Sequence, residues 1–268
     1  MEYIIGTSGY SYEDWRGVFY PPDLPKGKML DYYCQHFKAV EVNSTYYRIP
    51  HPAVFYQMEQ KTPDDFQFVV KAHQETTHLR QKNREAVQQL IEAVQPLIEK
   101  GKLSGFLAQF PYSFKNTPAN RDYLVQTRSF FQNYPLFVEF RNWTWDNPPT
   151  MKFLQDNRLA FVNVDQPRLP GLMKPRSVVT ADLGYLRFHG RNKENWWKGT
   201  NQTRYDYLYS QSELNEWLIR IAEMLKKTYR TYIFFNNHPR GHAVQNAKEL
   251  KEMLDNQIDR LFNLSESS

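Results

Sequence analysis

Residues 39–47, AVEVNSTYY, contain the pattern from which the predicted architecture follows. Val40 and Val42 alternate with Glu41 and Asn43, so a strand here would be apolar on one face and polar on the other. The polar face ends in a carboxylate and an amide, and a short run of small polar and aromatic residues follows it. This arrangement predicts a strand that packs on one side and presents functional groups at its C-terminal end.

Short apolar runs of the same kind recur along the whole chain. Alternation with a period of two, together with β-branched and aromatic residues, favours strands at these positions. The predicted strands are residues 3–5, 39–43, 66–71, 103–109, 136–141, 159–165, 185–190 and 232–236.

Segments with a helical pattern separate these strands. Asn120 and Ser212 are predicted N-caps, and Pro149 is predicted in a first helical turn. The predicted helices are residues 30–37, 53–61, 83–100, 120–133, 150–157, 212–227 and 243–254.

Strands that alternate with helices imply a parallel sheet with right-handed crossovers. Eight such strands in 268 residues favour a closed (β/α)8 barrel, the TIM barrel, in one α/β domain. An open, doubly wound sheet is the alternative, because the number of strands does not show closure. We predict a single domain over residues 1–264 and a disordered tail over residues 265–268.

The two faces of the predicted strands differ in polarity. The apolar side chains are expected to pack under the outer helices. The polar side chains cluster at C-terminal strand ends and are expected to point into one interior, where barrel enzymes have their active sites. This polar set is Glu41, Asn43, Lys71, His73, Gln109, Glu139, Arg141, Asn163, Asp165, Arg187, His189, Asn236 and His238.

The composition argues against several classes of protein. The net charge of +5 and the pI near 9.0 favour anionic ligands but fall well short of a dedicated nucleic-acid tail. Cys34 is the single cysteine, which favours a reducing compartment. The start of the chain, MEYIIGTSGY, lacks the features of a signal peptide, and no window reaches the roughly 18 apolar residues of a membrane span. We therefore predict a cytoplasmic protein with no membrane partner, and the oligomeric state stays open.

Several longer motifs resemble those of a known family. The motifs are GTSGYSYEDWRGVFYP at 6–21, VEVNSTYYRIP at 40–50, FVVKAHQETTH at 68–78, QFP at 109–111, VEFRNWTW at 138–145, YLRFHGR at 185–191 and FNNHPRGHAVQNAKEL at 235–250. They cover almost the whole chain and are similar to the YecE-like family of domain of unknown function 72. The resemblance implies a TIM barrel, with a fold similar to the endonuclease IV and xylose isomerase barrels. It implies no reaction, because one fold hosts many activities.

Glu41 and Glu139 are predicted to face one cavity from roughly opposite sides of the barrel. Two such carboxylates would act as general acid and base, or as metal ligands. The alternative is that inward cations neutralise them, because buried charges must be paired. Lys71, Arg141 and Arg187 are available for this pairing.

Lys71 and His189 complete the predicted catalytic set. Lys71 would serve as a Schiff-base lysine, a general base or an anion clamp. Because several acids lie nearby, we expect it to be charged and to act as a clamp. His189 would orient the substrate together with Asn236.

Arginines at neighbouring strand ends indicate an anionic substrate, because guanidinium groups bind phosphate and carboxylate in a bidentate manner. Gly241, before a helix that starts near Ala243, adds backbone N–H groups where TIM barrels often bind phosphate. The alternative is that these arginines are solvated surface residues. The predicted substrate-binding residues are Asn43, Tyr46, His73, Gln109, Arg141, Trp143, Asp165, Arg187, Arg191, Asn236 and Asn237.

Histidines leave the question of a metal open. His73, His189 and His238, together with the acids, are residue types that bind zinc or manganese. They are dispersed over separate strands, and the sequence contains no HExxH motif. We therefore assign no metal ligand, and a divalent metal cofactor stays an alternative.

Most tryptophans fall in predicted connections between strands and helices. Aromatic rings at the mouth of a cleft stack on sugars or bases, or close over a substrate. The alternative is that they cover the end of the barrel as a small additional core. The residues are Trp15, Trp143, Trp145, Trp196 and Trp197.

Together, these features predict an enzyme that acts on a phosphate- or carboxylate-bearing sugar or nucleotide by carboxylate acid/base chemistry. Hydrolase, lyase and isomerase reactions are not distinguished. One alternative is a nucleic-acid-binding protein or phosphodiesterase resembling endonuclease IV. The other is a barrel that binds a metabolite without acting on it.

Overall fold

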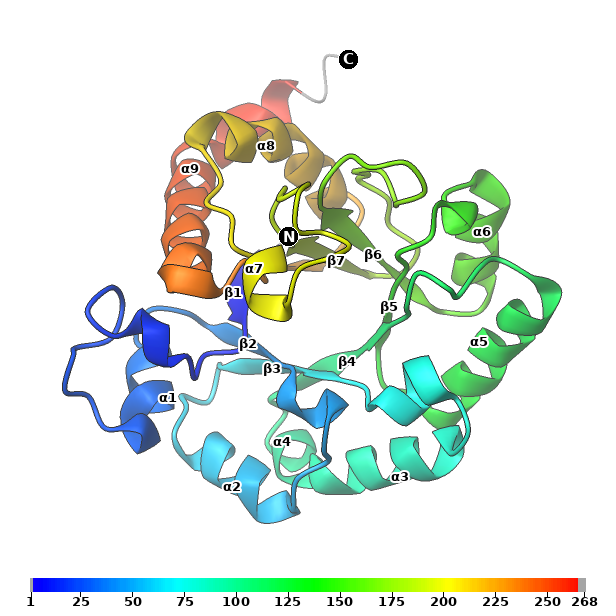
Figure 1. Ribbon diagram of the computed structural model, residues 1–268, viewed down its shortest axis with the longest axis horizontal. Coiled ribbons are helices and arrows are strands. Elements are labelled where there is room, and N and C mark those ends of the chain that lie inside the picture. Colours follow the sequence, from blue (N-terminus) through cyan, green and yellow to red (C-terminus); the bar gives the residue numbers. More distant parts are fainter. Residues whose placement is uncertain (1, 265–268) are drawn as a thin grey trace.

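Eight parallel strands close into a barrel in which each strand pairs with the next along the chain and β8 pairs with β1 (Figure 1). The computed structural model describes residues 2–264, so the tail predicted over residues 265–268 lies outside the described residues. The predicted TIM barrel is confirmed. The strands are β1 (Glu2–Ser8), β2 (Ala39–Val42), β3 (Gln67–Lys71), β4 (Leu103–Gln109), β5 (Leu136–Glu139), β6 (Ala160–Asp165), β7 (Leu183–Phe188) and β8 (Arg230–Phe235).

Helices surround the barrel and pack apolar side chains against the strands (Figure 1). For example, Phe188 of β7 meets Trp217 of α8 with ring centroids 5.5 Å apart. The α-helices are α1 (Met29–Tyr33), α2 (Pro52–Gln60), α3 (Asn83–Ala93), α4 (Gln95–Glu99), α5 (Pro118–Phe130), α6 (Pro148–Asp156), α7 (Asn201–Arg204), α8 (Gln211–Leu225) and α9 (His242–Leu264).

Some helix boundaries differ from the predicted ones. Thr117 and Ser210, rather than Asn120 and Ser212, are the N-caps of α5 and α8, and their side chains accept hydrogen bonds from the first turn. The long predicted helix that contains Pro96 is divided into α3 and α4. Proline has no N–H, and its ring clashes with the carbonyl one turn earlier.

The register of the sheet determines which side chains enter the barrel, because paired residues on neighbouring parallel strands point to the same face. Val164 pairs with Arg187, and Asp165 pairs with Phe188. Since Phe188 packs outward against α8, Asp165 points outward as well. Asn163, two residues earlier, shares this direction. The prediction that Asn163 and Asp165 point into the barrel is therefore wrong.

Aromatic side chains fill the barrel below its C-terminal mouth. The ring centroid of Tyr185 lies 4.5 Å from that of Phe137 and 5.4 Å from that of Phe234. Tyr232 completes this buried group. These rings close the interior from below, so a ligand reaches the inward polar groups only from the mouth.

Gly6 lies where β1 and β2 approach closely. A Cβ at this position would lie 2.2 Å from the carbonyl oxygen of Ala39. We expect Gly6→Ala to lower the free energy of unfolding by about 1–3 kcal/mol, because backbone must shift to relieve the clash. Urea unfolding measures the change. Gly27→Ala is the matched control, because a Cβ there meets nothing within 4 Å. Equal losses in the two variants would contradict this explanation.

Candidate functional site

A cavity of about 680 Å³ lies at the C-terminal mouth of the barrel. Strand ends contribute Lys71 and Gln109, and the connection after β2 contributes Asn43 and Tyr46. The long connection between β7 and α8, which includes α7, forms another wall (Figure 1). This volume lies within the range of sites that bind small organic ligands.

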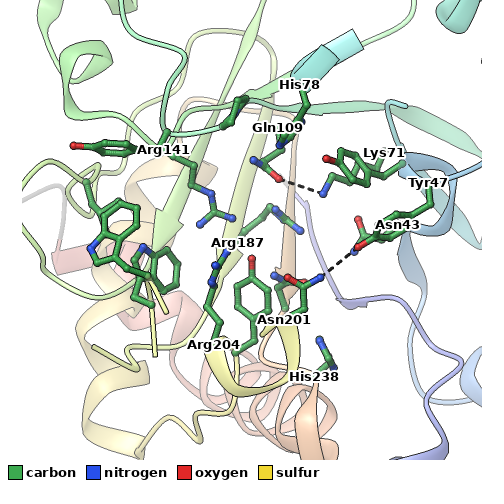
Figure 2. Close-up of a pocket in the computed structure, with 18 of the residues that line it drawn as sticks. Asn43, Tyr47, Lys71, His78, Gln109, Arg141, Arg187, Asn201, Arg204 and His238 are labelled. Carbon is green, nitrogen blue, oxygen red and sulfur yellow. Dashed lines mark hydrogen bonds between the residues drawn. The ribbon is translucent and has the colours of Figure 1, made fainter. Parts of the chain in front are cut away.

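Cationic side chains dominate this pocket. Lys71, Arg141, Arg187 and Arg204 line it and point toward its middle (Figure 2). In the described part of the chain, no Asp or Glu lines the pocket. Among the side chains that the structure describes, those of residues 2–257, neither Lys71 nor Arg204 forms an ion pair with a carboxylate. The pocket therefore carries a local excess of positive charge.

Arg187 forms the floor of the pocket and holds two carboxylates beneath it. Its Nη1 donates to Oε2 of Glu139 over 2.5 Å, and its Nη2 donates to Oε1 of Glu41 over 2.7 Å. The Tyr185 hydroxyl donates to the other oxygen of Glu41 over 2.6 Å. Both carboxylates are fully buried, and neither lines the pocket. The two acids are thus paired with an inward cation, as the alternative interpretation of the sequence predicted.

Arg141 places a second guanidinium on Glu139. Its Nη2 lies 3.0 Å from Oε1 of Glu139, and its Nη1 donates to Gln166 over 3.1 Å. Burial raises the pKa of Glu139, but Arg141 and Arg187 outweigh this effect and hold the pKa well below its ordinary value. Glu139 is therefore ionised at neutral pH and is poorly suited to donate a proton.

His189 lies beneath the pocket with both ring nitrogens engaged. Nε2 lies 3.1 Å from Oε1 of Glu139, and Nδ1 lies 3.1 Å from Nδ2 of Asn236. Burial and the nearby Arg141 lower the pKa of His189 to about 3, so the ring is neutral. Nε2 therefore donates to Glu139, while Nδ1 accepts from the Asn236 amide. In this state His189 orients its neighbours.

Lys71 is the pocket cation that is most easily deprotonated. Its Nζ donates to Oε1 of Gln109 over 3.2 Å and lies 4.7 Å from the ring centroid of Tyr46. Burial and Arg187 lower the pKa of Lys71 to about 8, although the two buried carboxylates oppose the shift. Most of the amine is charged at neutral pH, and about a tenth is neutral.

Aromatic rings form much of the pocket wall. Trp196 lies against Arg141, whose guanidinium carbon is 5.4 Å from the ring centroid. At the rim, Trp197 and Tyr112 have ring centroids 5.0 Å apart. Nδ2 of Asn201 in α7 donates to the Tyr47 hydroxyl over 3.3 Å (Figure 2). These rings offer flat surfaces on which a planar part of a ligand would stack.

Comparisons with known proteins agree with this fold over nearly the whole chain. The family described as "Protein of unknown function DUF72" matches residues 4–267. The chain belongs to the DUF72 family. It is 31% identical to the UPF0759 protein YunF of Bacillus subtilis (strain 168) over 268 residues, covering 94% of both chains.

Solved structures of other DUF72 proteins have the same architecture. One from Thermotoga maritima is 41% identical with a TM-score of 0.89, covering 95% of this chain and 100% of that one. Another, from Enterococcus faecalis V583, is 27% identical with a TM-score of 0.84, covering 94% and 95%. The predicted family membership is thus confirmed.

The DUF72 barrel brings many of the predicted site residues together. Glu41, Glu139 and His189 lie directly beneath the pocket in the network around Arg187. The residues that line the pocket itself are Asn43, Tyr46, Lys71, Gln109, Arg141, Arg187 and Asn236. Whether they bind a substrate stays a prediction.

Asp165 and Arg191 lie outside this pocket, contrary to the prediction. Asp165 accepts hydrogen bonds from the Trp217 indole over 2.7 Å and the Tyr209 hydroxyl over 2.8 Å. Arg191 binds Asp165 over 2.8 Å and Glu216 of α8 over 3.0 Å. Both residues therefore fasten the outer face of the barrel to α8.

His73, Trp143 and Asn237 also lie away from the pocket lining. Nδ1 of His73 accepts from the backbone N–H of Glu75. The Trp143 ring is exposed. The Asn237 amide donates to Asn246 of α9 over 3.0 Å. The predicted places of these three residues in the pocket were wrong, because beyond the strand ends the local turns and contacts with neighbouring elements decide where each side chain points.

Other predicted features have mixed outcomes. Trp196 and Trp197 line the pocket, whereas Trp15 and Trp145 are fully buried as the predicted additional core. In the described chain, no residue of α9 lines the pocket, so the helix that follows Gly241 adds no N–H group there.

His78, Arg204 and Tyr205 line the pocket but were not predicted as site residues. His78 lies in a π-helical turn, η4 (Glu75–Leu79). It also closes the motif FVVKAHQETTH, which marked it in the sequence. Arg204 and Tyr205 lie in the connection between β7 and α8. The length of this connection is the feature of the sequence that could have indicated a role in the site, because long connections are usually functional.

Two properties of the described residues bear on cofactors and membranes. In this part of the chain, no group of three or more His, Cys, Asp or Glu side chains is arranged to hold a metal ion. The same residues contain no helix whose length and apolar character would suit a membrane span.

Proposed function

We propose that this DUF72 protein is an enzyme whose barrel mouth binds a small organic anion, such as a phosphorylated sugar or a nucleotide. The observation that carries the proposal is the set of cations in the pocket, Lys71, Arg141, Arg187 and Arg204, without a lining carboxylate in the described chain. Positive charges gathered in a partly desolvated cavity repel one another, and an anionic ligand relieves that repulsion.

Unsatisfied donors support the same proposal. The Nε atoms of Arg187 and Arg204 are buried and have no hydrogen-bond partner in the described residues. A buried donor without a partner costs about 1–3 kcal/mol, and phosphate or carboxylate oxygens are strong acceptors for guanidinium groups. The aromatic walls formed by Trp196 and Tyr205 suit the sugar or base of such a ligand.

Glu41 and Glu139 support this proposal in a different role from the predicted acid and base. Arg187 separates both from the pocket, and they hold its guanidinium toward the ligand. Proton transfer at the ligand would instead fall to a lining group, and Lys71, with a pKa of about 8, is the suitable one.

Arg204→Met tests anion binding directly. We expect isothermal calorimetry to detect inorganic phosphate and ribose 5-phosphate binding to the unmodified protein, and the variant to bind ribose 5-phosphate at least about tenfold more weakly. Arg168→Met is the matched control, because the Arg168 side chain is exposed and pairs with Glu216 outside the pocket. Unchanged affinity in Arg204→Met, or no binding by the unmodified protein, would contradict the proposal.

The two alternatives that the sequence left open predict different results in binding experiments. A nucleic-acid-binding protein would bind an oligonucleotide with affinity that falls steeply with salt concentration. A metabolite sensor would bind the phosphorylated sugar tightly without forming a product. Both stay predictions.

A further inference from the structure

We infer that Lys71 forms a covalent imine with a carbonyl group of the bound anion. This inference rests on the proposed function, because the arginines of the pocket must first hold the anion. The substrate class is then a molecule with both a carbonyl and a phosphate or carboxylate, such as a 2-oxo acid or a phosphorylated keto sugar. Lys71 stands at the end of β3 and points into the middle of the pocket (Figure 2).

The surroundings of Lys71 differ from those of a structural lysine in the same protein. Lys102 is buried, and its Nζ donates to Oε1 of Glu59 over 3.1 Å and to two carbonyl oxygens over 2.8 and 2.9 Å. Its three donors are thus all engaged. Lys71 has only the Gln109 oxygen as acceptor within the described residues and otherwise faces the Tyr46 ring. Lys102 is therefore held in an ion pair, whereas the described residues place no carboxylate on the Lys71 amine.

Charged and titratable groups on every neighbouring element act on Lys71. Arg187 on β7 and Arg141 after β5 disfavour its charged form, and Glu41 on β2 and Glu139 on β5 favour it. Burial outweighs the carboxylates, which leaves the pKa of Lys71 at about 8. Two more titratable groups, Tyr46 and His78, line the same side of the pocket, and burial is the first cause that lowers the pKa of His78, to about 4. His78 is therefore neutral and adds no positive charge.

The proposed step balances within the site. The neutral Nζ attacks the carbonyl carbon and forms a carbinolamine, in which the carbonyl oxygen becomes a hydroxyl. This hydroxyl takes up a proton and leaves as water, while the nitrogen lone pair forms the C=N bond. From ammonium and ketone to iminium and water, the total charge and the number of hydrogen atoms are unchanged. No oxidant, reductant or metal is needed.

Reductive trapping tests the imine in the unmodified protein. The protein is incubated at neutral pH with pyruvate or with dihydroxyacetone phosphate, together with sodium cyanoborohydride, which delivers hydride to the iminium carbon. Peptide mapping by mass spectrometry then locates the secondary amine. We expect Lys71 to be labelled about two orders of magnitude faster than the exposed Lys152, because burial lowers the pKa of Lys71 to about 8 and the pocket arginines hold the anion beside it. Inorganic phosphate should slow the labelling of Lys71 alone.

Two controls and a titration with inorganic phosphate distinguish failure of the imine inference from failure of the proposed function. Lys71→Arg keeps the charge and should lose the label, and Lys102 should stay unlabelled in the unmodified protein. Binding of phosphate without preferential labelling of Lys71 would overturn the imine and leave the proposed function intact. Absence of both phosphate binding and labelling would overturn the proposed function and the imine together. Equal labelling of Lys71 and Lys152 would also overturn the inference.

Discussion

Arg187→Met will lower the free energy of unfolding at neutral pH by about 3–5 kcal/mol, because it leaves buried carboxylates without their main cation. In the native protein, the guanidinium of Arg187 binds Glu139 over 2.5 Å and Glu41 over 2.7 Å, and all three side chains are buried. Methionine fills much of the space but supplies neither charge nor hydrogen bond. Guanidinium chloride unfolding, followed by circular dichroism, measures the change.

The pH dependence of this variant distinguishes lost pairing from lost packing. In the native protein, the arginines hold the pKa of Glu139 well below its ordinary value, so its contribution to stability is lost as pH falls. In Arg187→Met, Glu41 loses its ion-pair partner and Glu139 keeps only Arg141, so the buried acids would bind protons more readily than in the unfolded chain and stability is lost as pH rises. The difference in stability between the two proteins should therefore be large near about pH 8 and smaller near about pH 5.

A second substitution provides the control for Arg187→Met. Adding Glu41→Gln removes one of the uncompensated charges and should recover part of the lost stability. Losses that simply add, or a stability difference that does not change with pH, would show that Arg187 stabilises the barrel through packing rather than through its charge.

Asp165→Ala will also lower the free energy of unfolding by about 3–5 kcal/mol, because a buried carboxylate with several donors is removed. Asp165 accepts from the Trp217 indole, the Tyr209 hydroxyl and the Arg191 guanidinium. Alanine leaves the two buried donors, Trp217 and Tyr209, without their acceptor and weakens the attachment of α8 to the barrel. Thermal unfolding and urea unfolding both measure the loss.

The affinity for ribose 5-phosphate distinguishes a purely structural role of Asp165 from a role in ligand binding. At a temperature where Asp165→Ala stays folded, its affinity should equal that of the unmodified protein. Asp156→Ala is the matched control for stability. Its carboxylate is exposed and pairs with Lys152 one turn away, so the expected loss is about 0.3–0.5 kcal/mol. A large loss of affinity in Asp165→Ala would restore the role that its sequence position predicted.

The alternation of polar and apolar residues along the strands predicted most of the pocket residues. It failed where the register between neighbouring strands decides which way a side chain points. Lys71, Gln109 and Arg187 enter the barrel mouth as their alternation with apolar residues predicts. On β6 the polar residues are equally regular, yet Asp165 faces outward because β6 pairs with β7 in the register that aligns it with Phe188. The polarity of Asp165 does not show which way its side chain points, because a polar partner is also available outside the barrel, on α8.

The charge state of the candidate site also depended on contacts between distant segments. The sequence shows that Glu41, Glu139 and Arg187 are inward, but not that Arg187 lies between the two acids and closes them off from the pocket. The same holds for Arg204 and Tyr205, which reach the pocket only because the connection between β7 and α8 folds back over the mouth.

The sequence by itself determined the barrel and the end at which its polar residues gather, because the strand and helix periods are local properties of the backbone. Only the tertiary structure decided which acids are paired, which polar strand residues face outward and which pocket cations have no carboxylate partner among the described side chains. Those properties depend on register and on distances between residues far apart in the chain. No local pattern encodes such distances, so they become defined only when the barrel closes.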